Sequence, residues 1–231
     1  MNLHLFSSPG PQDDIRYIVQ ASRQYLEGKN DPLVAYLPLA SLYDLRREYT
    51  EKAFHGLAGV ETINTELMEL PQMEAILRAA TLVYIPGGNT FLLNHRLHIS
   101  QLMPFLRKKV AAGLPVVAFS AGTVLCGPNI LTANDLNTIP TTYFKGLDAT
   151  PFNFFVHYPP DPVTRAFHDS WLHDYHAFHD NPVLILADGA YVQVDGRKTR
   201  LVRGEAWILR RGREKQALEE DAEIELQSQD S

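Results

Sequence analysis

The sequence has few of the features that mark several protein classes. It contains one cysteine, Cys126, so it holds no internal disulfide and shows no sign of an oxidising compartment. No apolar run approaches the length of a membrane span, and the first ten residues, MNLHLFSSPG, lack the cationic and long apolar regions of a signal peptide. Acidic residues outnumber basic ones, 27 to 21, which argues against a nucleic-acid partner. These absences predict a soluble, cytoplasmic protein without nucleic-acid or membrane partners.

The composition is that of an ordinary globular protein. The chain has 231 residues, of which 45% are hydrophobic and 21% charged, and its formal net charge is -6. This length is enough to bury a sizeable core, and because no linker or internal repeat interrupts it, we expect a single domain over residues 1–231. The acidic segment 214–231 is expected to form a solvated, flexible tail.

Short apolar segments alternate with amphipathic ones through the first half of the chain. This alternation predicts a mainly parallel sheet with helices on both faces. Strands are expected at 2–8, 32–40, 60–67, 81–88 and 114–121, and helices at 13–28, 43–57, 72–80 and 100–113. A loop-rich stretch follows, with an aromatic strand at 152–158 and a helix at 163–180. Four short segments between 182 and 212, separated by glycine turns, predict a C-terminal antiparallel meander.

Two predicted strands end in small residues. The first ends at Gly87 and Gly88, and the second ends at Ser120 in PVVAFSAGTVLCG. This second segment is similar to the nucleophile elbow G-x-S-x-G, but Ala118 occupies the first glycine position. Because the carboxyl ends of parallel strands line the ligand crevice, both features should lie at one edge of the sheet. Ser120 could then attack an acyl group whose oxyanion is bound by the amides of Gly88 and Ala121.

Several motifs, taken together, resemble the S51 family of serine peptidases. They are PGGNTFLLN (86–94), FSAG (119–122), GPNILTANDLN (127–137), FFVHYPP (154–160) and LADGAYVQV (186–194), in the family's order and over nearly the whole chain. The resemblance implies a flavodoxin-like fold related to class I glutamine amidotransferases. It also implies a serine nucleophile with a histidine base, and no cofactor or metal.

Carried over by position, the resemblance makes Ser120 the nucleophile and His157 the general base. Asp188 is the preferred partner to orient His157, although the family has a glutamate there, and Asp135 is the alternative. The implied reaction is hydrolysis of dipeptides with an N-terminal aspartate, whose side-chain carboxylate would meet Arg165 and Asn89. A guanidinium suits that role because it pairs bidentately with a carboxylate.

Other interpretations remain open at this point. An S51-like exopeptidase could read another N-terminal residue, act from the carboxyl end or be cyanophycinase-like. An esterase would share the triad, and the same scaffold could instead bind a small acidic ligand without turnover. His173, His176 and His179 recur every three residues and raise a weaker metal hypothesis. Cys126 is expected to be a buried apolar side chain and not the nucleophile. A homodimer is compatible with the sequence.

Overall fold

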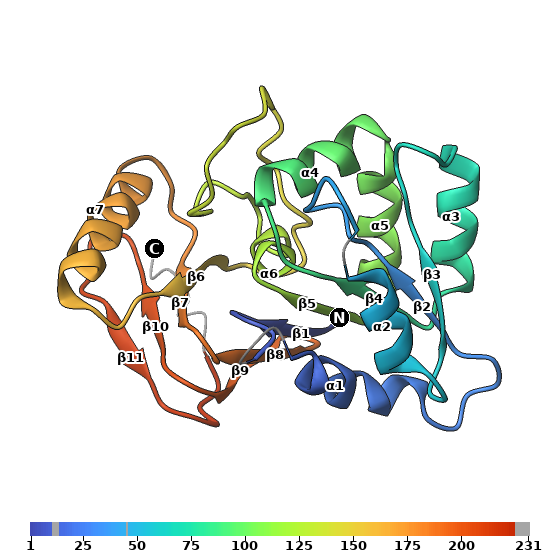
Figure 1. The fold of residues 1–231 in the computed structure, drawn as a ribbon. Helices are drawn as coiled ribbons and strands as arrows, with labels where there is room; N and C mark the ends of the chain where they lie inside the picture. The colour runs from blue at the N-terminus through green and yellow to red at the C-terminus, as the bar shows by residue number, and fades with distance from the viewer. Residues whose placement is uncertain (11–13, 45, 225–231) are drawn as a thin grey trace.

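The computed structural model describes residues 1–10, 14–44 and 46–224 (Figure 1). Its strands are β1 (Asn2–Phe6), β2 (Leu33–Tyr36), β3 (Gly59–Thr62), β4 (Leu82–Ile85), β5 (Val116–Phe119), β6 (Asn153–Tyr158), β7 (Val183–Ala187), β8 (Tyr191–Asp195), β9 (Lys198–Arg203), β10 (Ala206–Leu209) and β11 (Gln216–Leu218). Its helices are α1 (Arg16–Leu26), α2 (Arg47–Phe54), α3 (Leu70–Ala79), α4 (Thr90–Ile99), α5 (Leu102–Ala111), α6 (Ala121–Leu125) and α7 (Pro162–Phe178).

A seven-stranded sheet forms the centre of the molecule, in the order β3-β2-β4-β5-β1-β8-β9. The first five strands in this order are parallel, and β8 and β9 continue the sheet in antiparallel orientation. β4 and β5 are direct neighbours, with Ile85 opposite Ala118. The segments that follow them, which carry Gly87–Gly88 and Ser120, therefore lie at the same edge of the sheet, as the sequence predicted.

Helices cover both faces of this sheet because its central parallel strands, β4 and β5 among them, are buried and apolar on both sides. In β4, Leu82 and Tyr84 join a core with α1 and α2, whereas Val83 and Ile85 join the opposite core with α3, α4 and α5. Figure 1 shows the two groups of helices on opposite sides of the strands. The predicted α/β fold, with a mainly parallel sheet between two helical layers, is confirmed.

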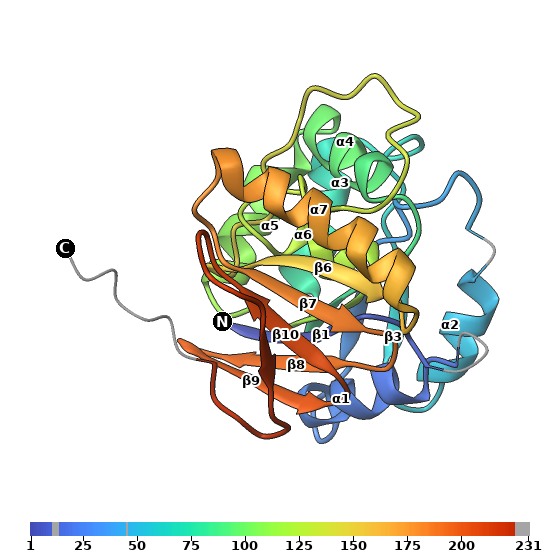
Figure 2. The ribbon, with the colours of Figure 1, turned by 90° about the vertical axis from the view of Figure 1, so that its left-hand side faces the viewer.

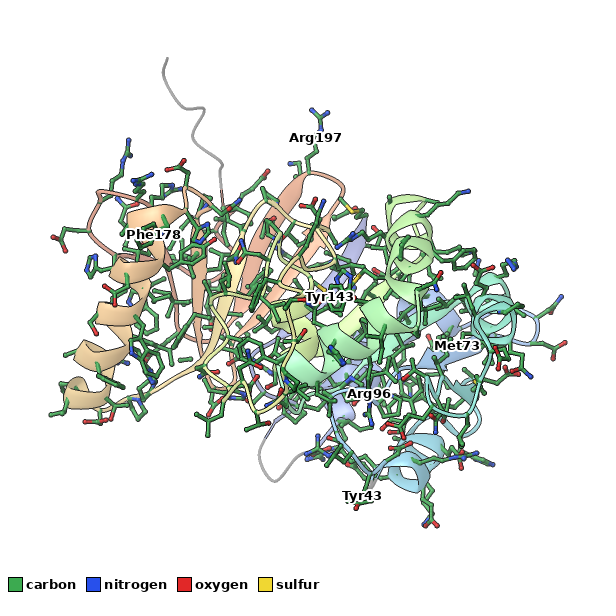
Figure 3. The ribbon with its side chains drawn as sticks, turned by 90° about the horizontal axis from the view of Figure 1, so that it is seen from above. Tyr43, Met73, Arg96, Tyr143, Phe178 and Arg197 are labelled. Atoms are coloured by element: carbon green, nitrogen blue, oxygen red, sulfur yellow. The ribbon has the colours of Figure 1, made fainter. Side chains whose placement is uncertain are left out.

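A second sheet, in the order β11-β10-β7-β6, lies beside the first and is covered by α7 (Figure 2). One of its faces contributes Phe154 and Leu184 to the core shared with the larger sheet, and the other packs against α7 through Phe155 and Ile185. In the view from above, Phe178 on α7 and Met73 on α3 lie at opposite ends of the molecule (Figure 3). The shared core supports the single-domain prediction, which stays a prediction.

The structure corrects the sequence analysis in three places. The four predicted C-terminal strands do not form one meander: β8 pairs antiparallel with β9 in the large sheet, whereas β7 pairs antiparallel with β10 in the small one. Helix α4 was not predicted, because residues on several of its sides are buried and its apolar residues do not form one stripe. The segment at 214–231 was expected to be a flexible tail, yet β11 pairs with β10 and Ile224 is buried. Residues 225–231 lie outside the described part.

None of the helices in the described residues has both the length and the apolar character that crossing a membrane requires.

Candidate active site

Ser120 occupies a strained turn between β5 and α6. Its backbone angles are φ 52° and ψ -117°, a conformation that few residues other than glycine adopt, and its N–H donates to the carbonyl of Phe6. Ala121 is the first residue of α6, so its N–H has no acceptor within the helix. The turn thus presents a hydroxyl and an amide side by side at the carboxyl end of β5.

Two glycines after β4 make room for this turn. A Cβ added at Gly87 would lie 2.9 Å from the Cβ of Ser120, so a side chain there would collide with the serine. Gly88 has φ +138°, and a Cβ there would lie 2.5 Å from the carbonyl oxygen of Ala40. Only glycine fits either position: the backbone at Gly87 packs against Ser120, and the backbone at Gly88 packs against Ala40.

His157 is brought to Ser120 by an irregularity in β6. The register of β6 against β7 shifts between Phe155 and Tyr158, and His157 within this bulge has φ 56°. Bulges of this kind redirect a side chain that would otherwise follow the alternation of the strand. The Nε2 atom of His157 lies 2.8 Å from the Oγ of Ser120. The two residues come from different sheets, and the bulge allows them to meet.

Asp188 completes a chain of hydrogen bonds. It follows the last residue of β7, and its Oδ1 lies 2.6 Å from Nδ1 of His157. When the proton of the neutral His157 ring is on Nδ1, that N–H donates to the carboxylate of Asp188. Nε2 is then unprotonated and can accept the hydroxyl proton of Ser120. The side chain of Asp188 is 68% exposed and that of His157 is 37% exposed, so water reaches this pair.

Asp135, the alternative partner of His157, lies elsewhere. Its Oδ2 accepts hydrogen bonds from the backbone N–H of Thr90, at 2.8 Å, and from the Thr90 hydroxyl. The carboxylate is thus placed at the first residue of α4, where it stabilises the helix end that follows Gly88. Its neighbour Asn134 donates to the carbonyl of Val156 in β6. This segment links the glycine turn to the strand that carries His157.

Two serines after β1 were not selected from the sequence. The Oγ of Ser7 accepts a hydrogen bond of 2.9 Å from the N–H of His157 and donates to the carbonyl of Leu186. The Oγ of Ser8 accepts from the N–H of Gly189. Ser7 is fully buried. Ser7 and Ser8 therefore fix the backbone segments that carry His157 and Asp188. The one sequence signal for the two serines is that they follow a predicted parallel strand.

The two predicted substrate-binding residues have partners within the protein. Asn89 caps α4 by accepting from the N–H of Leu92, and its amide nitrogen donates to the carbonyl of Leu136. The Nε of Arg165 donates to the carbonyl of Pro159 at 2.6 Å.

The guanidinium of Arg165 also lies over the rings of Tyr158 and Trp207. Its Nη2 is 3.7 Å from Glu205, which is a loose ion pair. The structure thus shows Arg165 as a stacked, oriented cation whose side chain is 30% exposed.

The other chemically interesting side chains lie apart from this arrangement. Cys126 is fully buried, as predicted, and burial raises the pKa of its thiol to about 12. On α7, His176 is buried and bonded to the carbonyl of His179, and His179 stacks on Tyr175. Within the described ranges no group of three or more His, Cys, Asp or Glu side chains is arranged to hold a metal ion.

Comparison with known proteins gives a consistent result. The profile of Peptidase family S51 matches residues 5–202. A Peptidase E of Nostoc sp. is 29% identical over 87% of this chain and 84% of its own length. A probable alpha-aspartyl dipeptidase of Drosophila melanogaster is 36% identical over 62% of this chain and 60% of its own length.

Among solved structures, a putative peptidase E protein from Listeria monocytogenes has the same fold. The TM-score is 0.70 at 22% identity, and the match covers 88% of this chain and 98% of that one. The family match spans most of the chain and includes the segments that carry Ser120, His157 and Asp188. This chain is a member of peptidase family S51.

Proposed function

We propose that this peptidase hydrolyses small peptides through an acyl-enzyme formed on Ser120. The observation that carries the proposal is the continuous hydrogen-bonded chain from Ser120 through His157 to Asp188. A serine hydroxyl needs a base within hydrogen-bonding reach, and the base needs a partner that fixes its tautomer. Both distances in this chain, 2.8 Å and 2.6 Å, lie within that reach.

In the proposed reaction, His157 accepts the proton of Ser120 while the Oγ attacks the peptide carbonyl. We assign the developing oxyanion to the amides of Ala121, which follows the serine, and of Gly88, which lies in the glycine turn after β4. His157 then gives its proton to the leaving amine, and the acyl group stays on Ser120. Water, deprotonated by His157, attacks the ester, and His157 returns the proton to the Oγ of Ser120 as the C–O bond breaks and the acid leaves. Asp188 stabilises the imidazolium in both halves of the reaction.

For the substrate we propose dipeptides with an N-terminal aspartate. Support comes from the name of the Drosophila relative, a probable alpha-aspartyl dipeptidase. Arg165 is the residue that we assign to the aspartate side chain, because its Nε is fixed by Pro159 and its guanidinium lies over two adjacent aromatic rings. The ion pair with Glu205 at 3.7 Å is loose enough to exchange for a substrate carboxylate.

The mechanism is tested with a serine-directed phosphonofluoridate probe and mass spectrometry. We expect one adduct on Ser120 in the wild-type protein, with no adduct and no peptide hydrolysis after Ser120→Ala. Thr123→Ser is a suitable control, since it retains a hydroxyl that can bond to the Phe6 carbonyl. Hydrolysis that persists in Ser120→Ala, or a wild-type protein that binds peptides without cleaving them, would contradict the proposal.

The substrate assignment is tested separately with Asp-Ala and Ala-Ala. Arg165→Met keeps most of the apolar contact with Tyr158 and Trp207 but removes the charge. We expect kcat/KM for Asp-Ala to fall by about 10- to 100-fold, the range for a charge-assisted hydrogen bond, with little change for Ala-Ala. An equal loss for both dipeptides would show that Arg165 does not read the aspartate.

A further inference from the structure

The peptide group that joins Val156 to His157 is held at both of its polar ends by side chains from outside the smaller sheet. Its carbonyl accepts a hydrogen bond of 3.1 Å from the side-chain amide of Asn134. Its N–H donates to the Oγ of Ser7 at 2.9 Å. Because a peptide group is planar, these two bonds fix the orientation of the whole group. The group lies directly before the Cα that carries the imidazole of His157.

The bulge in β6 explains why this peptide group needs partners outside the sheet. Two residues of β6, Val156 and His157, lie opposite one residue of β7, Leu186. A bulge of this kind interrupts the ladder of hydrogen bonds between the two strands. The Oγ of Ser7 bridges the interruption, because it accepts from the N–H of His157 and donates at 3.2 Å to the carbonyl of Leu186. Asn134 acts from the other side of β6, which is the last strand in the order of this sheet.

The backbone of His157 is strained, and the strain aims its ring. Its φ of 56° lies in the left-handed region, which residues other than glycine seldom adopt. In this conformation Nε2 lies 2.8 Å from the Oγ of Ser120, and Nδ1 lies 2.6 Å from Asp188. The angle φ is the rotation between the held peptide group and the Cα of His157. If the peptide group could turn, His157 would relax to an ordinary strand conformation and its ring would leave Ser120.

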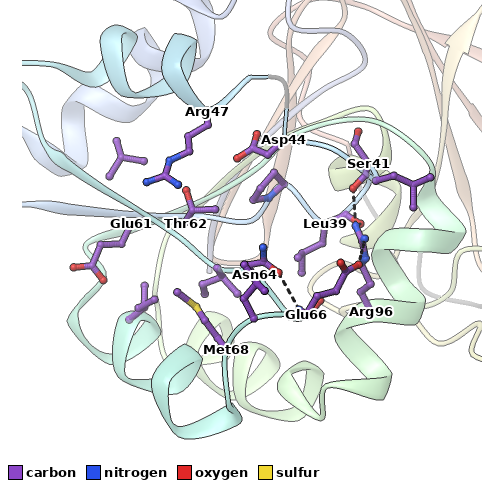
Figure 4. A pocket seen from close by; sticks show the side chains of 17 residues that line it. Leu39, Ser41, Asp44, Arg47, Glu61, Thr62, Asn64, Glu66, Met68 and Arg96 are labelled. Atoms are coloured by element: carbon purple, nitrogen blue, oxygen red, sulfur yellow. Dashed lines mark hydrogen bonds and ion pairs between the residues drawn. The ribbon is translucent and has the colours of Figure 1, made fainter.

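The segment that carries Asn134 is anchored to α4. The next residue, Asp135, accepts a hydrogen bond of 2.8 Å from the N–H of Thr90, the first residue of that helix. In the last turn of α4, the buried Arg96 donates at 2.6 Å to the carbonyl of Ser41 in the loop after β2. Figure 4 shows this contact at the wall of a cavity of about 610 Å³. Asn134 therefore extends from a segment that is bonded to a helix with contacts at both of its ends.

The geometry points to Asn134 as a positioning residue for the general base. Together with Ser7 it holds the peptide group before His157 and so keeps the imidazole against Ser120. This inference rests on the proposed function, in which His157 is the base, and adds a residue outside the triad. The acceptor is a backbone carbonyl, so the side chain at position 134 must donate, which an asparagine amide does and an ionised aspartate does not. Because Asn134 acts on the base, its loss should slow the chemical step and leave peptide binding unchanged.

The test replaces Asn134 by alanine and follows two reactions of Ser120. Hydrolysis of Asp-Ala gives kcat and KM separately, and the rate constant of phosphonofluoridate labelling reports on the base with a probe that is not a peptide. We expect kcat and the labelling rate constant to fall by the same factor, about 10-fold, because the carbonyl of Val156 loses its donor. KM should stay within about twofold of the wild-type value. Asn134→Asp keeps the size of the side chain but cannot donate, so it should lose at least as much, and it serves as the test if Asn134→Ala does not fold.

Thr132→Val is the matched control, because Thr132 makes the same kind of bond from the same segment to the same strand. Its hydroxyl donates at 2.8 Å to the carbonyl of Phe154, and the residue is buried. Its loss should lower the melting temperature at least as much as Asn134→Ala does, while kcat and the labelling rate constant stay at their wild-type values. Equal losses of kcat in Thr132→Val and Asn134→Ala, or unchanged labelling in both Asn134 variants, would overturn the inference.

The conformation of His157 separates this inference from the proposed function. Crystal structures of the wild-type protein and of Asn134→Ala give the φ of His157 and the distance from its Nε2 to the Oγ of Ser120 without any turnover. A 10-fold loss leaves about a tenth of the molecules aligned, so in the variant this distance should exceed about 3.5 Å, beyond a hydrogen bond. An unmoved His157 would refute the role of Asn134. If the wild-type protein neither hydrolyses peptides nor reacts with the probe, the proposed function fails, and the two structures still decide whether Asn134 positions His157.

Discussion

Replacing Asp188 by asparagine separates the charge of this residue from its hydrogen bond. The carboxylate contacts Nδ1 of His157 at 2.6 Å and is 68% exposed, so an asparagine there can rotate freely and present its oxygen to the same nitrogen. The orientation of the ring should therefore survive, and the attraction between the carboxylate and the imidazolium is lost. The size of the effect then depends on how well water screens that attraction.

Coulomb's law sets the range of the expected effect. Two unit charges about 4 Å apart attract by about 1 kcal/mol in water and about 4 kcal/mol at an effective dielectric constant of about 20. These values correspond to rate losses of about 5-fold and about 10³-fold. Replacing a buried triad aspartate by asparagine costs about 10⁴-fold in kcat, because the ring then adopts the wrong tautomer. We expect Asp188→Asn to lose less than 10³-fold, since both side chains are open to water.

The assay is steady-state hydrolysis of Asp-Ala at pH 8, with kcat and KM determined separately. The change should appear in kcat, because the charge acts on the imidazolium that forms during the reaction. Asp148→Asn is a control of the same type, since Asp148 is half-exposed and its carboxylate lies 3.9 Å from Nζ of Lys145. A loss of 10⁴-fold or more would show that the pair is effectively buried during catalysis. An unchanged kcat would refute the role of Asp188.

Three further predictions concern the elements that support the site. Ser7→Ala should lower kcat about 10-fold with KM unchanged, because the N–H of His157 loses its acceptor, at a cost of about 1–3 kcal/mol. Gly122→Ala should destabilise the protein by about 1–3 kcal/mol, the usual cost of overpacking, since its Cβ would lie 2.3 Å from the carbonyl oxygen of Ile85. Burial lowers the pKa of His4 from 6.5 to about 4, so its stabilising effect is present above pH 6.5 and is lost as the pH falls toward 4. Urea denaturation should show a loss of about 2 kcal/mol between pH 7 and pH 5 from this group.

Each of these predictions has a control on the same chain. Ser22→Ala removes another buried serine hydroxyl, one that bonds to a carbonyl in α1, and should leave kcat unchanged. Gly59→Ala adds a methyl group where the nearest atom is 3.7 Å away, so its stability should remain close to wild type. His4→Gln should flatten the pH dependence. Equal effects in a test variant and its control, or an unchanged pH dependence in His4→Gln, would contradict the corresponding prediction.

The larger features of the fold could be predicted from the sequence because they follow from local patterns. The alternation of strands and helices through residue 121, apart from α4, depends only on hydrophobic periodicity. The placement of the Gly87–Gly88 turn and Ser120 at one edge of the sheet follows from the geometry of parallel strands. The assignment of His157 and Asp188 needed the family resemblance, since a histidine in an aromatic strand would otherwise be read as a core residue. Their contact depends on the bulge in β6, which no local pattern announces.

Other features depend on tertiary contacts that a sequence does not display. Helix α4 is buried on several sides, so it lacks the periodicity by which helices are found. β11 is a short, partly exposed strand whose pairing with β10 brings part of the predicted tail into the smaller sheet. The partners of Asn89 and Arg165, Leu136 and Pro159, are backbone carbonyls, and any residue type could supply them. Side-chain identity therefore gave no signal for either contact.

The elbow at Ser120 shows where the need for small residues arises. The usual motif has glycine two positions before the serine, but here Ala118 lies in β5 with its side chain in the apolar core and causes no conflict. The space around the serine is provided instead by Gly122, which packs against the carbonyl of Ile85, and by Gly87, which passes the serine itself. One of these glycines belongs to the turn after a different strand. A motif written around the serine alone includes Gly122 but omits Gly87. The two segments PGG and SAG together include both of the glycines that make room for Ser120.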